Sequence, residues 1–353
     1  MQKGLWRKET YMNETIRYLL DSACPSIKYR VKKEILNEMS SDEEELLQSQ
    51  ILEDKLVQEF IERQSPDGWI EEDFHSEKGV ETAIRLLSEK GVLPNQPSLK
   101  GMLGELERRE DTFDKGCLFN IGKILDHKSF GGSKVIRAAT FAHAGIEDRH
   151  FVKEQIEWAL DKLKFVCSVS AIDDIAIHYK DKLVFMDGTK WPCIYDLRLL
   201  AYTKAWRSEE NKEIVVDSIK RMVELSPIPY IHVLKRNQLI APAAFCMQDF
   251  NPDVNVLKDS EWMMWFHRME ILARLGVTSH IKELEQQIDF LAKLLRENNG
   301  IFNKRMNHYY FTKWSPYSGL ALEKDWRTEK RRICDLTFRS LLILHYSGYK
   351  DYN

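Results

Sequence analysis

The stretch Ala83-Ile84-Arg85-Leu86-Leu87, with Gly91-Val92 after it, decides the fold because the same pattern returns twice. The other copies are Val135-Ile136-Arg137-Ala138-Ala139 before Gly145-Ile146 and Met269-Glu270-Ile271-Leu272-Ala273 before Gly276-Val277. A glycine just past the last helical turn can adopt the left-handed conformation that caps the exposed carbonyls, and the apolar residue after it packs back on the helix. Each copy therefore predicts a helix that ends at the glycine and folds back on a second helix as a hairpin.

The rest of the chain shows helical spacing as well, whereas alternating strands are hard to find. Apolar stripes of helical period run through residues 281–295, where Asn298-Asn299-Gly300 ends the helix, and through residues 152–166. Further turns are expected at Cys24-Pro25, Ala205-Trp206-Arg207 and Ser347-Gly348-Tyr349, which gives about six hairpins. Repeated hairpins cover one another as an open solenoid or as a closed ring, and periodicity does not choose between the two.

The bulk composition suits one large folded domain. The chain has 353 residues, of which 43% are hydrophobic and 30% charged, and its formal net charge is −3. This near balance of charge excludes a global field that would attract nucleic acid or an anionic membrane. A closed array of hairpins holds this many residues around one core, so we expect a single domain over residues 1–353.

Targeting signals are missing from the sequence. The first ten residues carry Lys3, Arg7 and Lys8 and have no apolar core of a secretory signal, and no run is long and apolar enough for a membrane span. The six cysteines are scattered without a CxxC pair, as is typical of buried thiols in a reducing compartment. We therefore expect a soluble, cytoplasmic protein.

One hexapeptide, Gln64-Ser65-Pro66-Asp67-Gly68-Trp69, resembles the QW-type repeat of the prenyltransferase and squalene cyclase superfamily. In that family Gln, Gly and Trp join one hairpin to the next; here the usual residue between Gly68 and Trp69 is absent. The stretch that follows, with His75-Ser76-Glu77-Lys78 and a Leu-rich helix to Gly91, is similar to small bacterial members. An ordinary turn with a packed Trp also accounts for the hexapeptide.

The resemblance implies an all-α protein built as an α/α toroid (barrel) with a central ligand cavity. Protein prenyltransferases of this fold bind zinc through an Asp and a Cys two residues apart and a distant His. The sequence contains no Asp-x-Cys and no paired-His motif, and it has no glycine-rich phosphate loop. We therefore predict neither a metal nor a cofactor.

Polar residues in apolar helices are the candidates for catalysis in such a cavity. Asp196 and Arg198 lie in the apolar run 191–200, in which Pro192 suits a first helical position. Asp335 and Arg339 are spaced i, i+4 and so share one helix face. Asp196 and Asp335 are the candidate general acids or bases, and Arg198 and Arg339 the candidate groups for an anionic substrate. The alternative is that these residues form structural ion pairs.

A second acidic candidate is the segment Ala171-Ile172-Asp173-Asp174, which resembles the DxDD motif of class II terpene cyclases. The first Asp of that motif is Ala171 here. Clustered carboxylates raise one pKa and thereby keep one acid protonated, so Asp173 and Asp174 are further catalytic candidates. The same pair also fits a helix N-terminus, where acidic residues interact favourably with the helix dipole.

Aromatic and basic residues complete the candidate ligand site. Aromatic walls stabilise cations or stack on sugar rings, and arginines hold anions, although packed cores and solvated faces show the same residues. The candidate ligand-binding residues of this kind are Trp191, Tyr195, Trp262, Trp265, Tyr310 and Arg327.

Three functional hypotheses follow, because the sequence does not reveal which reaction, if any, the chain catalyses. The first is a toroid that binds a hydrophobic, isoprenoid-like small molecule, either neutral or anionic. The second is a carbohydrate-active enzyme, a glycosidase or lyase on an (α/α)6 barrel, and the third is a non-catalytic scaffold or binding protein. Fold analogy alone does not decide among them.

Overall fold

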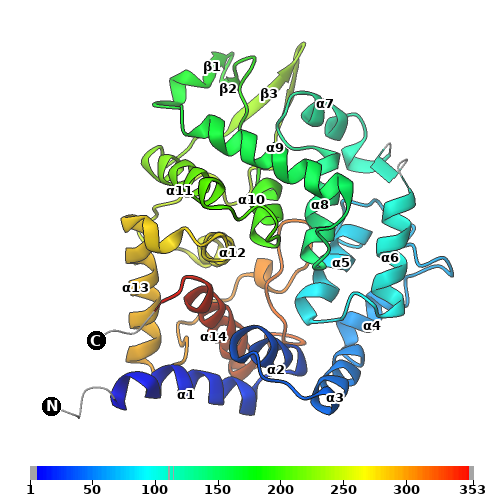
Figure 1. Cartoon of the computed structure of the whole chain (residues 1–353), viewed down its shortest axis with the longest axis vertical. Coiled ribbons are helices and arrows are strands. Elements are labelled where there is room, and N and C mark those ends of the chain that lie inside the picture. The colour runs from blue at the N-terminus through cyan, green and yellow to red at the C-terminus, as the bar shows by residue number, and fades with distance from the viewer. Residues whose placement is uncertain (1–5, 110–111, 114, 350–353) are drawn as a thin grey trace. The chain divides into compact units, whose positions relative to one another are not determined.

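The computed structural model describes residues 6–109, 112–113 and 115–349. This part of the chain is 56% helical, with fourteen α-helices and one small four-stranded sheet (Figure 1). The prediction of a mostly helical protein is confirmed, and the sheet is an addition that the sequence analysis did not predict.

The chain divides into two compact units. Unit 1 comprises Met1–Glu71, Arg85–Gly101 and Leu257–Asn353, and unit 2 comprises Glu72–Ile84 and Met102–Val256. The chain passes between them within helices α5 (Val80–Lys90) and α6 (Pro97–Arg108). The single domain expected over residues 1–353 stays a prediction.

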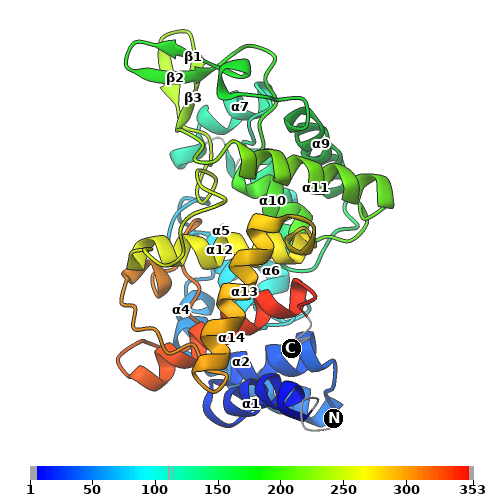
Figure 2. The ribbon, with the colours of Figure 1, turned by 90° about the vertical axis from the view of Figure 1, so that its left-hand side faces the viewer.

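Unit 1 is assembled from both ends of the chain. Besides its parts of α5 and α6 it contains α1 (Trp6–Ser22), α2 (Pro25–Arg30), a π-helical turn (Val31–Leu36), α3 (Ser41–Leu52), α4 (Lys55–Ile61), α12 (Asp259–Leu275), α13 (Lys282–Glu297) and α14 (Glu329–Tyr346). Helix α14 packs against α1, α12 and α13 and so joins the two ends of the chain (Figures 1 and 2). The turn expected near Cys24-Pro25 lies between α1, which ends at Ser22, and α2, which begins at Pro25.

Unit 2 is built on a group of mutually packed helices. These are α7 (Ile121–His127), α8 (Ser133–His143), α9 (His150–Val166), α10 (Ile194–Ala201) and α11 (Glu209–Glu224). Helices α8, α9 and α10 pack on one another, α7 packs on α8, and α11 packs on α9. The turn expected at residues 205–207 lies between α10 and α11, as the sequence predicted.

The sheet belongs to unit 2 and lies beside α7 and α9 in both ribbon views (Figures 1 and 2). Its strands are β1 (Ala176–Tyr179), β2 (Lys182–Phe185), β3 (Ile231–Lys235) and β4 (Gln238–Ile240), in that order. The outer pairs are antiparallel, and β2 pairs with β3 in parallel. Strands of three to five residues are too short for their alternation to stand out in a sequence, which explains why none was predicted.

The recurring glycines end their helices as predicted. Gly91, Gly145 and Gly276 have φ of +88°, +78° and +79°. In each copy the N–H of the following residue donates to the carbonyl five residues before it: Val92 to Leu87, Ile146 to Phe141, and Val277 to Leu272. These bonds are those of a Schellman cap, so the sequence pattern and the helix ends have the same physical cause.

The QW-like hexapeptide joins two helices of unit 1. The side-chain amide of Gln64 donates to the carbonyls of Gly68 (2.9 Å) and Ser98 (2.8 Å), and Ser98 lies in the first turn of α6. A Cβ on Gly68 would lie 2.9 Å from the backbone of Gly101, so only glycine allows this approach. Gln64 and Gly68 therefore link the segment after α4 to α6.

Substitution of Gly145 by Ala tests how much these glycine caps contribute to the free energy of unfolding. No heavy atom lies within 4 Å of the added methyl group, so the cost comes from the left-handed backbone alone and is expected to be about 1–2 kcal/mol. Gly104→Ala is the matched control, because Gly104 is exposed, is helical and also has no neighbour within 4 Å. It should stabilise the chain by about 0.5–1 kcal/mol. Urea unfolding that showed equal effects for both variants would contradict this account.

Candidate functional site

The residues predicted from the sequence fall into two groups, one in each unit. Asp173, Asp174, Trp191, Tyr195, Asp196 and Arg198 belong to unit 2, and Trp262, Trp265, Tyr310, Arg327, Asp335 and Arg339 belong to unit 1. Each group is described by its own contacts.

Asp196 is an ion-paired capping residue of α10. It is 0% exposed; its Oδ2 accepts the N–H of Cys193 (2.8 Å) and its Oδ1 accepts from Lys162 Nζ of α9 (2.7 Å). Helix α10 begins at Ile194, so the expectation that Pro192 is its first residue is wrong. The carboxylate of Asp196 stabilises the helix start in place of Pro192, and its partner is Lys162 instead of Arg198.

Tyr195 and Arg198 lie in a buried polar cluster with Glu81 of α5 and His75 of the loop before it. Tyr195 Oη donates to Glu81 Oε1 (2.6 Å), His75 Nδ1 lies 2.5 Å from Glu81 Oε2, and the Arg198 guanidinium lies 5.0 Å from the Tyr195 ring centroid. Burial opposes the ionised form of Glu81, but His75, Tyr195 and Arg198 together lower its pKa. Glu81 in turn raises the pKa of His75 against the effect of burial. The cluster therefore holds a charged His–Glu pair.

Trp191 and the Asp173-Asp174 pair offer little to a ligand. Trp191 borders an apolar hollow of about 20 Å³, which has room for about one water molecule. Asp173 and Asp174 form a short 3-10 turn before β1, so the helix start that was the alternative for them is wrong. The N–H groups of Ala171 and Ser170 lower the pKa of Asp174, which is the opposite of what a protonated cyclase acid needs.

The aromatic residues of unit 1 form a closed core instead of a wall. Trp262 and Trp265 are fully buried and make an edge-to-face contact with each other, and Trp265 makes another with Phe266. Trp265 Nε1 donates to Gln287 Oε1 (2.8 Å). Tyr310 is half-buried against His308, and Arg327 is exposed. The packed-core alternative for Trp262 and Trp265 is therefore the one that the geometry favours.

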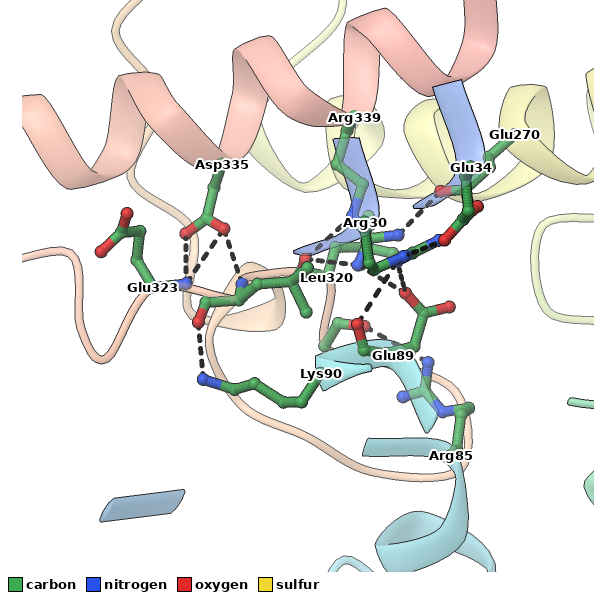
Figure 3. A network of polar contacts seen from close by, with 12 residues as sticks. Arg30, Glu34, Arg85, Glu89, Lys90, Glu270, Leu320, Glu323, Asp335 and Arg339 are labelled. Carbon is green, nitrogen blue, oxygen red and sulfur yellow. Dashed lines mark hydrogen bonds and ion pairs between the residues drawn. The ribbon is translucent and has the colours of Figure 1, made fainter. Parts of the chain in front are cut away.

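Arg339 is the centre of a buried charge network in unit 1 (Figure 3). Its guanidinium donates twice to the Leu320 carbonyl (2.9 and 2.7 Å) and pairs with Glu89 (2.9 Å) and Glu270 (2.8 Å). Arg30 pairs with Glu89 (2.6 Å) and with Glu34. Arg339 thus ties α14 to α5, α12 and the loop that precedes α14.

The charges of this network balance. Arg274 contacts Glu34 and Glu270, each at 3.1 Å, so three arginines (Arg30, Arg274, Arg339) face three glutamates (Glu34, Glu89, Glu270). Burial opposes ionisation of Glu34, but Arg30 and Arg274 lower its pKa to about 2. Glu34 is therefore ionised and is unsuited to proton transfer at neutral pH.

Asp335, one turn before Arg339 on α14, anchors the same loop. Its carboxylate accepts the N–H of Glu323 (3.1 Å) (Figure 3). It also accepts the N–H of Leu322 (2.6 Å) and the indole N–H of Trp326 (2.7 Å). Asp335 and Arg339 share a helix face, as their spacing predicted, but both bind the loop and no bond joins them to each other.

Glu323 is the carboxyl of this loop that reaches a cleft. The cleft has a volume of about 410 Å³ and is lined by Cys24, Pro25, Ser26, Gln50, Ile51, Glu53, Asp54, Glu323 and Lys324. Glu323 is 8% exposed, and its Oε1 accepts the N–H of Cys24 (2.8 Å). Lys90 Nζ, fully buried, donates to Asp54 Oδ2 (2.8 Å) and to the Leu322 carbonyl (2.5 Å).

The acids around Lys90 exceed the available positive charge. Burial raises the pKa of Glu323 to about 7, with a further contribution from the neighbouring Asp335. Burial likewise raises the pKa of Asp335 to about 6, despite the donors that bind it. Lys90 is the cation that opposes both shifts, and it already pairs with Asp54. The Glu323–Asp335 pair therefore retains a proton near neutral pH, which is the property of a general acid.

Sequence reasoning found Asp335 but missed Glu323, Lys90 and Lys162. Glu323 follows the short apolar run Leu320-Ala321-Leu322 in a loop without helical period, and Lys90 ends a helix where a basic residue is expected for the dipole. Their proximity to Asp335 depends on contacts between distant segments, for which a single sequence carries no signal.

The described residues contain no group of three His, Cys, Asp or Glu side chains that could hold a metal ion. Within the same residues, none of the helices is both long and apolar enough to cross a membrane. The chain matches no protein-family model, no curated protein and no solved structure.

Arg339→Met is expected to lower the free energy of unfolding by about 3–5 kcal/mol, because it leaves buried Glu89 and Glu270 without their shared partner. Arg332→Met is the control on the same helix, since Arg332 pairs with the exposed Glu329 and such pairs contribute about 0–1 kcal/mol. Guanidinium unfolding of both variants measures the difference. Similar losses in the two variants would show that the network has no special weight.

Glu323→Gln is expected to change how stability depends on pH. Folded Glu323 binds its proton up to about pH 7, whereas an unfolded Glu releases it at about pH 4.3, so this group destabilises the fold progressively as pH rises between these values. The wild type should therefore lose stability relative to Glu323→Gln as pH rises from about 4.3 to about 7, measured by urea unfolding. Glu329→Gln, at an exposed position, should follow the wild type. Parallel curves for wild type and Glu323→Gln would refute the raised pKa.

Proposed function

We propose that the chain is an enzyme that uses acid–base catalysis, and that its active site is the cleft of unit 1 whose lining includes Glu323. The observation that carries the proposal is a carboxyl on the wall of a 410 Å³ cleft, packed beside the buried carboxyl of Asp335. A general acid works best when its pKa lies near the operating pH, and burial supplies that shift here.

Each residue of the site has a distinct part in this proposal. Glu323 donates a proton to the leaving oxygen of a substrate bound in the cleft. Asp335 is a positioning residue, because it holds the backbone N–H groups of Leu322 and Glu323 and so fixes the loop that carries the acid. Glu53, on the opposite segment of the lining, is the candidate base that activates water, whereas Asp54 is already bound to Lys90 and to the first turn of α4.

The chemistry of the lining favours a hydroxylated substrate, as in the carbohydrate-active hypothesis. Carboxylates, the Gln50 amide and the Ser26 hydroxyl offer donors and acceptors for sugar hydroxyls, and Pro25 and Ile51 are the apolar residues of the lining. A carboxyl pair is also the machinery that glycoside hydrolysis requires. The proposed reaction is hydrolysis or elimination at a glycosidic bond.

The toroid that binds an isoprenoid-like molecule is the second proposal. It is supported by the glycine-capped helices and by the bonds of Gln64 to Gly68 and Ser98. Trp262 and Trp265 do not contribute to its ligand, because both are fully buried in packed core. A cytoplasmic location is part of both proposals.

Release of reducing sugar from a panel of neutral and uronate polysaccharides tests the enzyme proposal. Glu323→Gln is expected to lower kcat by about 10²–10⁴-fold and to remove the limb of the pH profile near pH 7, while Glu329→Gln leaves both unchanged. Absence of turnover on every substrate, or full activity of Glu323→Gln, would overturn it. Binding of farnesyl diphosphate by the inactive chain would favour the isoprenoid proposal instead.

A further inference from the structure

A second cleft, in unit 2, is lined by basic groups. It has a volume of about 320 Å³ and lies among α7, the loop after α7, the start of α8 and one face of α9. Three lysines reach it: Lys123 from α7, Lys134 from α8 and Lys162 from α9. This volume is within the range of sites for small ligands.

Lys162 is the most informative of these residues. It is 3% exposed, and its ammonium group carries three donors. One donor binds Asp196 Oδ1 at 2.7 Å, and within the described residues no second acceptor is in hydrogen-bond range of Nζ. A buried ammonium with unfilled donors is costly unless a ligand or solvent completes it. Because Lys162 lines the cleft, the missing acceptor is expected there.

Gln155 adds a second polar group on the same helix. It lies about two turns before Lys162 on α9, is 8% exposed and lines the same cleft. Its side-chain amide makes no hydrogen bond to any described residue, so the amide that borders the cleft is available to a ligand. The ammonium group of Lys134 also lines the cleft; it interacts electrostatically with Asp126 and forms no salt bridge within the described residues. The cleft thus presents donors that the protein itself does not use.

The one carboxylate of the lining is already bound by the protein. Asp126 Oδ1 accepts the N–H groups of Gly132 (3.0 Å) and Lys134 (3.4 Å) at the start of α8. The helix N-terminus stabilises this charge, and Lys134 and Lys162 also interact with it electrostatically. Three lysines against one carboxylate still leave the lining with net positive charge for a ligand.

We propose that this cleft binds a small phosphate monoester, with the phosphate at Lys162, Lys134 and Gln155. Ammonium groups bind phosphate as point charges, and the Gln155 amide adds a directional donor. Trp158 lies one turn after Gln155 on the same side of α9, is 44% exposed and also lines the cleft. Its indole offers the apolar surface on which the organic part of the ester lies. This site is independent of the proposed reaction at Glu323.

Isothermal titration of the full chain with inorganic phosphate, ribose 5-phosphate, ribose and gluconate tests the site. Ribose 5-phosphate should bind more tightly than phosphate, because it adds contact with Trp158, and ribose should not bind. Gln155→Leu and Lys134→Met should each weaken ribose 5-phosphate about tenfold, equivalent to about 1.4 kcal/mol. Lys153→Met, on the same helix but outside the lining, should leave binding unchanged.

Lys162 is tested as a double variant, because its removal alone would leave Asp196 buried and unpaired. Lys162→Met with Asp196→Asn keeps an acceptor for the Cys193 N–H and should abolish binding while the helical circular dichroism stays native. If this variant does not fold, Gln155→Leu and Lys134→Met still decide the question. No binding of either phosphate compound, tighter binding of gluconate, or wild-type affinity in Gln155→Leu and Lys134→Met would overturn the proposal.

Discussion

Unit 1 depends on the interactions that the guanidinium of Arg339 makes. One group satisfies the Leu320 carbonyl and the carboxylates of Glu89 and Glu270, which come from three separate segments of the chain. Every glutamate of that network pairs with an arginine, and the arginines lower the pKa of Glu34. One helical turn away on α14, burial raises the pKa of Asp335 to about 6. The same helix therefore contributes to a charge-balanced network and to a site whose carboxyl binds its proton more tightly.

Much of the helical architecture could be predicted because its causes are local. The glycines after α5, α8 and α12 and the stripe of α13 specify helix ends and buried faces within a few residues. The sheet could not be predicted, since β2 pairs with β3 across two intervening helices and each strand is very short. The arrangement of the hairpins also depends on distant contacts, which explains why periodicity left ring and solenoid equally open.

The candidate site was predictable only in part, for a different physical reason. A charged residue inside an apolar helix marks a buried polar interaction, so Asp196, Asp335 and Arg339 could be identified from the sequence. The partner that gives each one its role lies elsewhere in the chain, as Lys162, Glu323 and Glu89 show. For aromatic residues such as Trp262 and Trp265 the sequence does not indicate which role they have, because packed cores and ligand-binding walls contain the same side chains.

The composition of unit 1 from both ends of the chain has a consequence during synthesis. The segments that carry Arg30, Glu34 and Glu89 leave the ribosome early, whereas Arg274 and Arg339 are among the later residues to be made. Most of unit 2 is translated in the interval, and its helices α7 to α11 are continuous in sequence. Nascent chains that lack α14 therefore hold Glu34, Glu89 and Glu270 with only Arg30 and Arg274 to pair with them, so one negative charge of the network stays uncompensated until Arg339 is made.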